Sequence, residues 1–304
     1  MEFLESTPAP LYYNEIPEDA KDLFHYTDAG GFLGMVQHHK LWLTNIHYQN
    51  DSKEYYYAFK LVRNILIKEY NGLAINFLKG FKNKVSSVFT FSLSEKRDLL
   101  SQWRGYCPKG GFSLSFDRRQ FNEVIKQEKL IVGRCLYDKV SQRNAVIQHV
   151  IGFTSKEYSD ACQDTKQTMQ QLPPEMFYFG KHLFESISQI APLLKHSSFA
   201  GEKEWRVFKV VQTSSEAKSL AQSAQYYFPE GLVKVRPRQN MLIPYIEVPM
   251  LDEKGLFVNI SKVFISPTPH KKLALDSCGV ALHPDKSINY GVVVRNSKIP
   301  YVNW

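Results

Sequence analysis

The stretch GEKEWRVFKVV, residues 201–211, is where the sequence first indicates both a fold and a site. Its second half alternates as a half-buried strand does, with Trp205 and Val207 two residues apart. Its first half carries two acids, Glu202 and Glu204, separated by one residue. Side chains two apart on a strand share a face, so repulsion between these carboxylates must be relieved by solvent, a cation or a shared proton. The pair therefore marks either a solvated strand edge or a site at the rim of a sheet.

Runs with similar strand character lie on both sides of this stretch. They are rich in β-branched and aromatic residues and are bounded by turn-forming residues. The predicted strands are 23–27, 41–45, 87–92, 111–117 and 130–138 before it, and 231–237, 241–250, 262–267 and 291–302 after it. Strands therefore return at both ends of the chain.

Helical periodicity lies between these strands. Residues 32–40 and 50–70 have the apolar spacing of helices, and 93–110 predicts a helix followed by a Gly-rich turn. From about 139 to 195, long segments of mixed polarity are broken at LPPE, and we expect two helices there. No Gly/Ser linker separates the strands. The pattern predicts a single α+β domain over residues 1–304 with a helical insertion at about 139–195.

The composition is that of a folded protein. The 304 residues are 43% hydrophobic and 13% aromatic, which is enough for a sizeable core. No run of about 18 apolar residues appears, and MEFLESTPAPLYYNEIPEDA is acidic where a secretory signal would be basic and then apolar. We therefore expect a cytoplasmic protein with no membrane partner.

The cysteines point to neither a metal site nor a disulfide framework. They are widely scattered, with no CxxC pair and no accompanying histidine spacing. The four cysteines are Cys107, Cys135, Cys162 and Cys278. We expect reduced, mostly buried thiols and no bound metal.

The formal net charge of +8 bears on partners more than on the fold. Basic residues recur in KGFKNK, DRRQ, VKVRPRQ and PHKK rather than in one tail. This pattern indicates either a positive face that attracts nucleic acid or a phosphorylated cofactor, or an ordinary solvated surface.

Several familiar enzyme classes lack their local motifs. The sequence contains no GxGxxG after a strand, no GxxxxGK[ST], no GxSxG and no HExxH. A Rossmann dehydrogenase, a P-loop NTPase, an α/β-hydrolase and a zinc protease of the HExxH type therefore have no support.

Polar clusters lie at the ends of the first two predicted strands. In His25–Thr27 the histidine and the threonine share one strand face, so both can bind one ligand, although a satisfied core histidine explains the residue equally. In TNIHYQNDSKE, Asn45, Asn50, Asp51 and Glu54 straddle a helix start. Helix capping alone accounts for Asn50 or Asp51.

A third cluster precedes two glycines in SQWRGYCPKGG. Trp103, Arg104 and Tyr106 there form a segment able to present a guanidinium to a phosphate and an aromatic ring to a flat ligand. This combination is suggestive of a nucleotide site.

The order of these motifs resembles the DUF2971 family of bacterial proteins. The blocks are LFHYTDAGGFLGMVQHHKLWLTNIHYQNDSKE, then FTFSLSE with SQWRGYCPKGGFSLSFD, then GEKEWRVFK, then VVVRNSKIPY, and together they span about residues 21 to 302. DUF2971 proteins are in turn similar to the ADP-ribosyltransferase superfamily. The resemblance implies an α+β fold with an ADP-ribosyltransferase-like split β-sheet core, mixed or antiparallel.

The same resemblance implies roles for individual residues. His25 matches the first-strand residue that holds the ribose and carboxamide of NAD, and Ser92 matches the middle-strand position. Glu204 matches the catalytic glutamate, and Glu202 the position that helps to select the acceptor. The sequence departs from the H-Y-E triad, because its tyrosines lie outside the expected middle strand. The predicted catalytic residues are Glu204 and His25, and the predicted substrate-binding residues are Glu202, Tyr26, Thr27, Asn45, Ser92, Trp103, Arg104 and Tyr106.

The chemistry of that superfamily suits these residue types. Breaking the ribose–nicotinamide bond creates positive charge on the ribose, which the carboxylate of Glu204 can stabilise. Arg104 and the glycines after it can bind the NAD pyrophosphate. Arg206 either adds to that contact or forms a salt bridge that fixes the strand.

We therefore expect an NAD-dependent mono-ADP-ribosyltransferase acting as a bacterial toxin or antiviral effector. The positive charge favours RNA or DNA over protein as the acceptor, and a neutralising antitoxin is a candidate partner. Three alternatives stay open: an NAD glycohydrolase, a basic nucleic-acid-binding protein without activity, and a divalent-metal hydrolase. The last would use Asp51, Glu54, Glu202 and Glu204, whose spacing matches no recognised metal signature.

Overall fold

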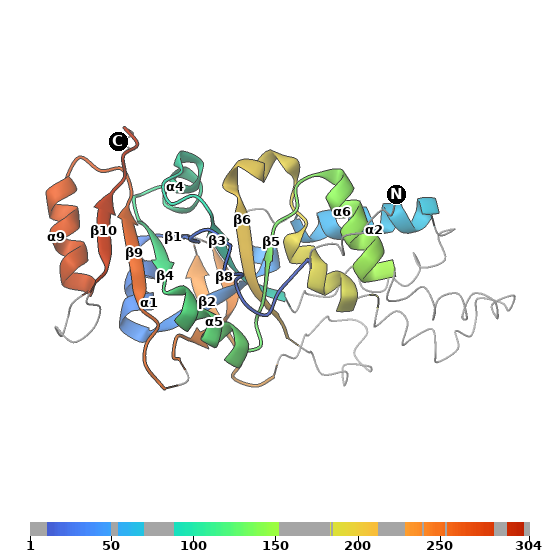
Figure 1. Ribbon diagram of the computed structural model, residues 1–304, viewed down its shortest axis with the longest axis horizontal. Coiled ribbons are helices and arrows are strands. Elements are labelled where there is room, and N and C mark those ends of the chain that lie inside the picture. Colours follow the sequence, from blue (N-terminus) through green and yellow to red (C-terminus); the bar gives the residue numbers. More distant parts are fainter. Residues whose placement is uncertain are drawn as a thin grey trace, which may run out of the picture.

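Two open β-sheets organise the protein (Figure 1). The computed structural model describes residues 11–49, 54–69, 88–151, 183, 185–211, 229–238, 240–252, 254–282 and 291–300. One sheet contains β2 (Lys40–Asn45), β3 (Val88–Ser94), β5 (Ile131–Arg134), β6 (Glu204–Val210), β7 (Val233–Arg238) and β8 (Met241–Pro249). The other contains β1 (His25–Thr27), β4 (Phe112–Phe116), β9 (Ile260–Ile265) and β10 (Val293–Asn296). Every one of these strands overlaps a segment that the sequence predicts to be a strand.

The strand orders join distant parts of the chain. The six-stranded sheet has the order β5-β6-β3-β2-β8-β7 and is antiparallel, whereas the four-stranded sheet has the order β1-β4-β9-β10 with β10 parallel to β9. Helices accompany both sheets: α1 (Ala29–His38), α2 (Glu54–Glu69), α4 (Leu100–Tyr106), α5 (Arg118–Gln127), α6 (Lys139–Val146) and α9 (Lys271–Leu282). The predicted α+β class is confirmed.

The six-stranded sheet splits between β2 and β3. These strands pair only at Thr44 with Thr90 and at Asn45 with Phe89, although β3 pairs with β6 along its whole length. Along the part of β3 that does not pair with β2, the backbone of Phe24, just before β1, exchanges two hydrogen bonds of 2.8 Å with the backbone of Ser94. The two sheets therefore meet at β3, beside the gap that β2 leaves.

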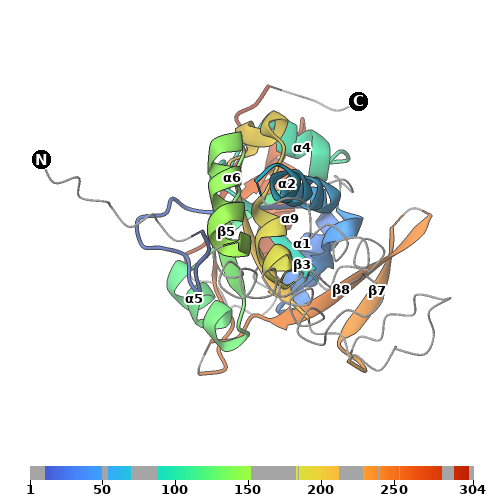
Figure 2. The same ribbon diagram turned by 90° about the vertical axis from the view of Figure 1, so that its right-hand side faces the viewer.

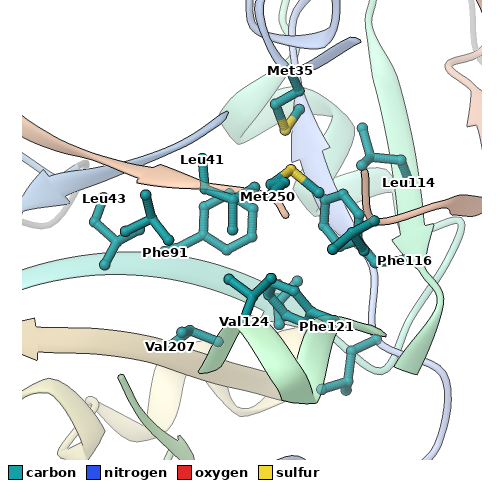
Figure 3. Close-up of a cluster of buried hydrophobic side chains, with 14 of the residues drawn as sticks. Met35, Leu41, Leu43, Phe91, Leu114, Phe116, Phe121, Val124, Val207 and Met250 are labelled. Atoms are coloured by element: carbon teal, nitrogen blue, oxygen red, sulfur yellow. The ribbon is translucent and has the colours of Figure 1, made fainter. Parts of the chain in front are cut away.

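Alternation on the strands fills the space between the sheets. Val207 faces inward from β6, whereas its neighbour Phe208 faces the opposite side of the sheet. Figure 3 shows part of the inner cluster, with side chains from both sheets and from α1 and α5. The residues labelled there are Met35, Leu41, Leu43, Phe91, Leu114, Phe116, Phe121, Val124, Val207 and Met250. Burial of these apolar side chains is the main force that joins the two sheets.

The opposite face of the six-stranded sheet is partly covered by helices. A second apolar cluster joins Val88 and Phe208 to side chains of α2, α6 and the short 3-10 helix η3 (Ala191–Leu193). Tyr57 of α2 donates a hydrogen bond of 2.7 Å to Gln142 of α6. Figure 1 shows α2 and α6 at the end of the molecule opposite α9.

Both ends of the predicted helical insertion are helical. Residues 139–146 form α6, a π-helical turn η2 (Ile147–Ile151) follows, and 185–190 are helical before η3. Most of the span between them, including LPPE, lies outside the described residues.

Two helices appear that the sequence reasoning missed, α5 and α9. Asp117 caps α5 by accepting a hydrogen bond of 3.0 Å from the backbone of Gln120. Its buried residues Phe121, Val124 and Ile125 have helical spacing, which was the available signal.

Candidate functional site

His25 lies at the junction of the two sheets. Its ring stacks on Phe91 with 4.0 Å between ring centroids, and its Nδ1 donates a hydrogen bond of 2.9 Å to the backbone oxygen of Ser92. In a full ladder β2 would lie along that edge of β3. Because the sheet is split there, a side chain of the other sheet binds the carbonyl instead.

The environment keeps the imidazole neutral. Burial lowers the pKa of His25 to about 4, the hydrogen bond to Ser92 opposes this change, and the positive charge of Arg236 adds to it. A neutral ring that donates through Nδ1 has Nε2 as its acceptor nitrogen. At neutral pH His25 can therefore accept a hydrogen bond from a ligand hydroxyl.

The two acids of the opening stretch do not share a strand. Glu202 ends a 3-10 helix, η4 (Ser197–Glu202), and β6 begins at Glu204. Between them Lys203 adopts a left-handed backbone conformation with φ of 47°. The prediction that both carboxylates project from one face of a strand is wrong in its geometry, because the chain turns between them.

A buried lysine brings the two carboxylates together. Nζ of Lys195 contacts Oε2 of Glu202 at 2.6 Å and also Oε2 of Glu204. Nε of Arg206 donates to Oε1 of Glu204 at 2.8 Å. We call Lys195, Glu202, Glu204 and Arg206 the ionic cluster. Of the three forms of relief open from the sequence, a cation is therefore the one that the structure uses.

The ionic cluster is balanced and almost closed to solvent. Glu204 is 3% exposed, Lys195 2% and Arg206 1%. Burial would raise the pKa of Glu204, but the attraction of Arg206 and then of Lys195 outweighs it and holds that pKa below its usual range. Two cations and two carboxylates are what a low-dielectric site requires, since an unpaired buried charge is very costly.

Neighbouring side chains hold the ionic cluster in position. The hydroxyl of Ser94 donates to the backbone oxygen of Glu202 at 2.6 Å, and the backbone N–H of Glu204 donates to the hydroxyl of Tyr137 at 2.9 Å. Gln142 donates to the backbone oxygen of Lys195 at 2.7 Å. These contacts come from β3, from the segment between β5 and α6, and from α6, and together they fix the backbone that carries the ionic cluster.

Tyr106 ends α4 next to the ionic cluster. Burial raises the pKa of its hydroxyl, and the negative charge of Glu204 raises it further. Tyr106 therefore stays protonated at neutral pH and can donate a hydrogen bond.

Strand register joins His25 to the ionic cluster. On β3 and β6, Ser92 lies opposite Arg206 and Ser94 lies opposite Glu204. His25, bound to the backbone of Ser92, is thus one strand away from β6. Of the predicted site residues, Ser92, Glu202, Glu204 and Tyr106 lie around the ionic cluster. The ring of His25 stacks instead on Phe91, which faces the inner apolar cluster on the other side of the sheet from Glu204.

Tyr26 and Trp103 lie in a small core between β1 and α4. Their rings make an edge-to-face contact with centroids 4.7 Å apart. The hydroxyl of Tyr26 accepts a hydrogen bond of 3.0 Å from the backbone of Leu99, and Nε1 of Trp103 donates to Asp98 at 2.7 Å. In the described structure these two side chains pack α4 against the sheet.

The other predicted binding residues lie near the same strands. Asn45, fully buried at the end of β2, accepts a hydrogen bond of 3.1 Å from the backbone of His47. Thr27 is half-buried, and its backbone oxygen accepts a hydrogen bond from the thiol of Cys107. Arg104 is exposed on α4.

Arg236 of β7 is a site residue that sequence reasoning missed. Its guanidinium donates to the hydroxyl of Thr44 at 2.9 Å and lies over Trp42 and Tyr245, at 5.0 Å and 5.6 Å from their ring centroids. Its charge also reaches His25. The basic run VKVRPRQ was visible in the sequence, but nothing in it pointed to one arginine.

Metal-binding geometry does not occur in the described part of the chain. No group of three or more histidine, cysteine or acidic side chains there is arranged to hold a metal ion. Asp51 lies outside the described residues, and Glu54 begins α2. Cys107, Cys135 and Cys278 are free and buried, and Cys162 lies outside the described residues.

A separate cleft of about 370 Å³ opens between the N-terminal segment and the start of α5. Two of the cations that line it are engaged: Lys262 pairs with Asp22, and Arg118 donates to the backbone oxygens of Glu18 and Ala20. This cleft contains none of the predicted site residues. The junction of β1, β3 and β6 is therefore the stronger candidate.

The comparisons with known proteins point to one family. The family model described as a protein of unknown function, DUF2971, matches residues 102–207, from within α4 to β6. No curated protein and no solved structure matches the chain. Within the described residues, no helix has the length and apolar character needed to cross a membrane. The matched span covers less than half of the chain and includes Tyr106, Glu202 and Glu204, so it is this part of the chain that is similar to the DUF2971 family.

Proposed function

We propose that this protein is an NAD-dependent mono-ADP-ribosyltransferase that modifies nucleic acid. One observation carries the proposal: His25 on β1 binds the backbone of Ser92 on β3, and β3 pairs with β6, the strand that begins at Glu204. These are the three strand positions that the resemblance to the ADP-ribosyltransferase superfamily assigns to NAD. A role as a toxin or antiviral effector with a neutralising partner follows from the same resemblance.

The reaction breaks the bond between ribose C1′ and the nicotinamide nitrogen, which leaves with the bonding electrons. An oxygen or nitrogen of the acceptor then forms the new bond to C1′ and loses its proton. Positive charge develops on the ribose in between, and a nearby carboxylate stabilises it. The neutral His25 supplies an acceptor for a ribose hydroxyl, and Arg236 supplies a cation for the pyrophosphate.

The ionic cluster adds a requirement. Both carboxylate oxygens of Glu204 are engaged: Oε1 accepts from Arg206, and Oε2 accepts from Lys195 and, at 3.4 Å, from Arg206. Catalysis by Glu204 therefore requires one of these pairs to open when NAD binds. Lys195 is the partner to move, because it is also held by Glu202, whose side chain is 14% exposed.

The test is incubation of the purified protein with labelled NAD and, separately, RNA, DNA and cell-lysate protein. We expect label on nucleic acid with the wild type and none with Glu204→Gln. Because this variant leaves a buried cation in excess, the double variant Glu204→Gln with Lys195→Met restores the charge balance. It should fold and stay inactive.

Glu95→Gln is the matched control. Glu95 also pairs with an arginine, Arg134, but it binds Trp205, whose side chain lies on the other face of β6 from Glu204. Labelling by the folded double variant at the wild-type rate would overturn the role of Glu204. Release of free ADP-ribose without an acceptor would indicate a glycohydrolase, and no consumption of NAD at all would refute the proposed function.

A further inference from the structure

Cationic and aromatic side chains share one face of β2, β8 and β7. Residues paired directly across neighbouring strands point to the same side of a sheet. The register pairs Trp42 with Glu247 and Thr44 with Tyr245 on β2 and β8, and Tyr245 with Lys234 on β8 and β7. We call this surface the β7 face, and its members are Lys40, Trp42, Thr44, Lys234, Arg236, Arg238, Tyr245 and Glu247.

Positive charge is in excess on the β7 face. Glu247 is its one carboxylate among the described residues, and it accepts hydrogen bonds of 2.8 Å from both Lys40 and Lys234. Arg236 binds the uncharged hydroxyl of Thr44. The four cations of this face thus meet Glu247 on the face itself and the charge of Asp28, which acts on Arg236 from the start of α1. Positive charge is still in excess, and a polyanion laid across the face would balance it.

Aromatic rings lie among these cations. Trp42 and Tyr245 are tilted at 45° to each other with centroids 5.0 Å apart, and the guanidinium of Arg236 covers both. Tyr245 is buried and Trp42 is half-buried, so Trp42 is the more accessible of the two aromatic residues. Figure 2 shows β7 and β8 as a ribbon that extends away from the helices at the front of that view.

We propose that the β7 face binds a single strand of RNA or DNA. A groove that combines cations for the phosphates with aromatic and guanidinium planes for the bases is the recurring solution for single strands. In a duplex the faces of the bases are stacked on one another and are not open to the aromatic rings of a protein. An acidic protein surface carries no bases that could stack on those rings. The β7 face therefore fits an unpaired polynucleotide better than either.

The β7 face continues toward the junction of the sheets. Strands β7, β8, β2 and β3 are consecutive in the sheet, and the charge of Arg236 reaches His25. A polynucleotide that continues along this face runs toward β3, whose Ser92 binds His25. The inference that this polynucleotide is the acceptor of ADP-ribose rests on the proposed function. The inference that it binds to the β7 face does not.

The test is fluorescence anisotropy with a labelled single-stranded oligonucleotide of about 12 nucleotides, titrated at several salt concentrations. The variant is Lys234→Gln with Arg238→Gln, and its matched control is Lys271→Gln with Lys272→Gln, two exposed lysines on α9. We expect the variant to lose roughly tenfold or more in affinity and the salt slope to fall by about 1.4, as two lost phosphate contacts require. The control should match the wild type.

A second variant tests the aromatic part. Trp42→Leu keeps an apolar side chain but removes the ring, and it should weaken binding by roughly fivefold to a hundredfold with the salt slope unchanged. Equal losses in the α9 control, an unaffected β7 variant, or equal competition by duplex DNA or polyglutamate would each overturn the inference. NAD binding by the wild type is measured separately by calorimetry. Oligonucleotide binding without NAD binding would sustain this inference and remove the proposed function.

Discussion

The six-stranded sheet carries two groups of lysine, arginine and glutamate side chains, the ionic cluster at β6 and the β7 face. In the ionic cluster the side chain of Lys195 is 3% exposed, and each cation has a carboxylate partner. On the β7 face the side chain of Lys234 is 48% exposed and shares Glu247 with Lys40. Water solvates unbalanced charge on the β7 face, but it cannot do so in the ionic cluster. Equal numbers of positive and negative charges therefore indicate part of the protein interior. An excess of one charge indicates a surface that can bind a partner of the opposite charge.

The largest expected effect tests the difference between the two regions most directly. Glu204→Ala leaves Lys195 and Arg206 buried with one carboxylate fewer, and we expect a loss of about 3–5 kcal/mol in unfolding free energy. Glu247→Ala is the matched change on the β7 face and should cost about 1 kcal/mol or less. Urea unfolding at neutral pH measures both. Similar losses for the two variants would show that burial does not separate these regions.

His25, between the two regions, gives an intermediate effect that depends on pH. The unfolded chain protonates this histidine below about pH 6.5, but the folded protein does so only near pH 4. Its contribution to stability is therefore complete above pH 6.5 and declines as the pH falls toward 4, by roughly 3 kcal/mol at most.

The variant His25→Asn isolates this contribution. Its amide keeps a donor for the backbone oxygen of Ser92 but does not titrate. Unfolding free energies at pH 7, 6 and 5 should decline less steeply in the variant than in the wild type. Parallel curves would assign the acid sensitivity to other groups.

The smallest expected effect has the opposite sign, because it is a gain in affinity and not a loss. Glu247→Gln removes the negative charge from the β7 face and frees Lys40 and Lys234 from it, so oligonucleotide binding should tighten by about threefold at low salt. The gain should vanish at high ionic strength. Anisotropy titrations check this, and weaker binding by the variant would contradict the excess of positive charge as the source of affinity.

The strands could be predicted from the sequence because their signal is local. β-branched and aromatic residues with a period of two mark a strand wherever it pairs, and every described strand overlaps a predicted one. The helices α5 and α9 were missed although α5 has Asp117 at its cap and apolar residues at helical spacing. The strand order was beyond reach, since β3 and β6 are far apart in the chain and only packing selects their pairing.

The candidate site likewise contains residues that the sequence predicted and residues that it did not. The sequence singled out His25, Ser92 and Glu204 from their order, and Arg206 as a salt-bridge partner of the strand is borne out by its pair with Glu204. Lys195 and Arg236 carried no local signal, because one precedes a short 3-10 helix and the other is one of several basic residues on an edge strand.

By itself the sequence determined which segments form strands. It also showed two acids near the start of one strand, and the repulsion between their carboxylates has to be relieved. Only the tertiary structure decided how. A left-handed turn at Lys203 separates the two residues along the chain, and Lys195 rejoins their carboxylates. The reason is physical: alternation of side chains is a property of neighbours in sequence, whereas the partner of a buried charge is chosen by whatever the fold brings within about 3 Å of it.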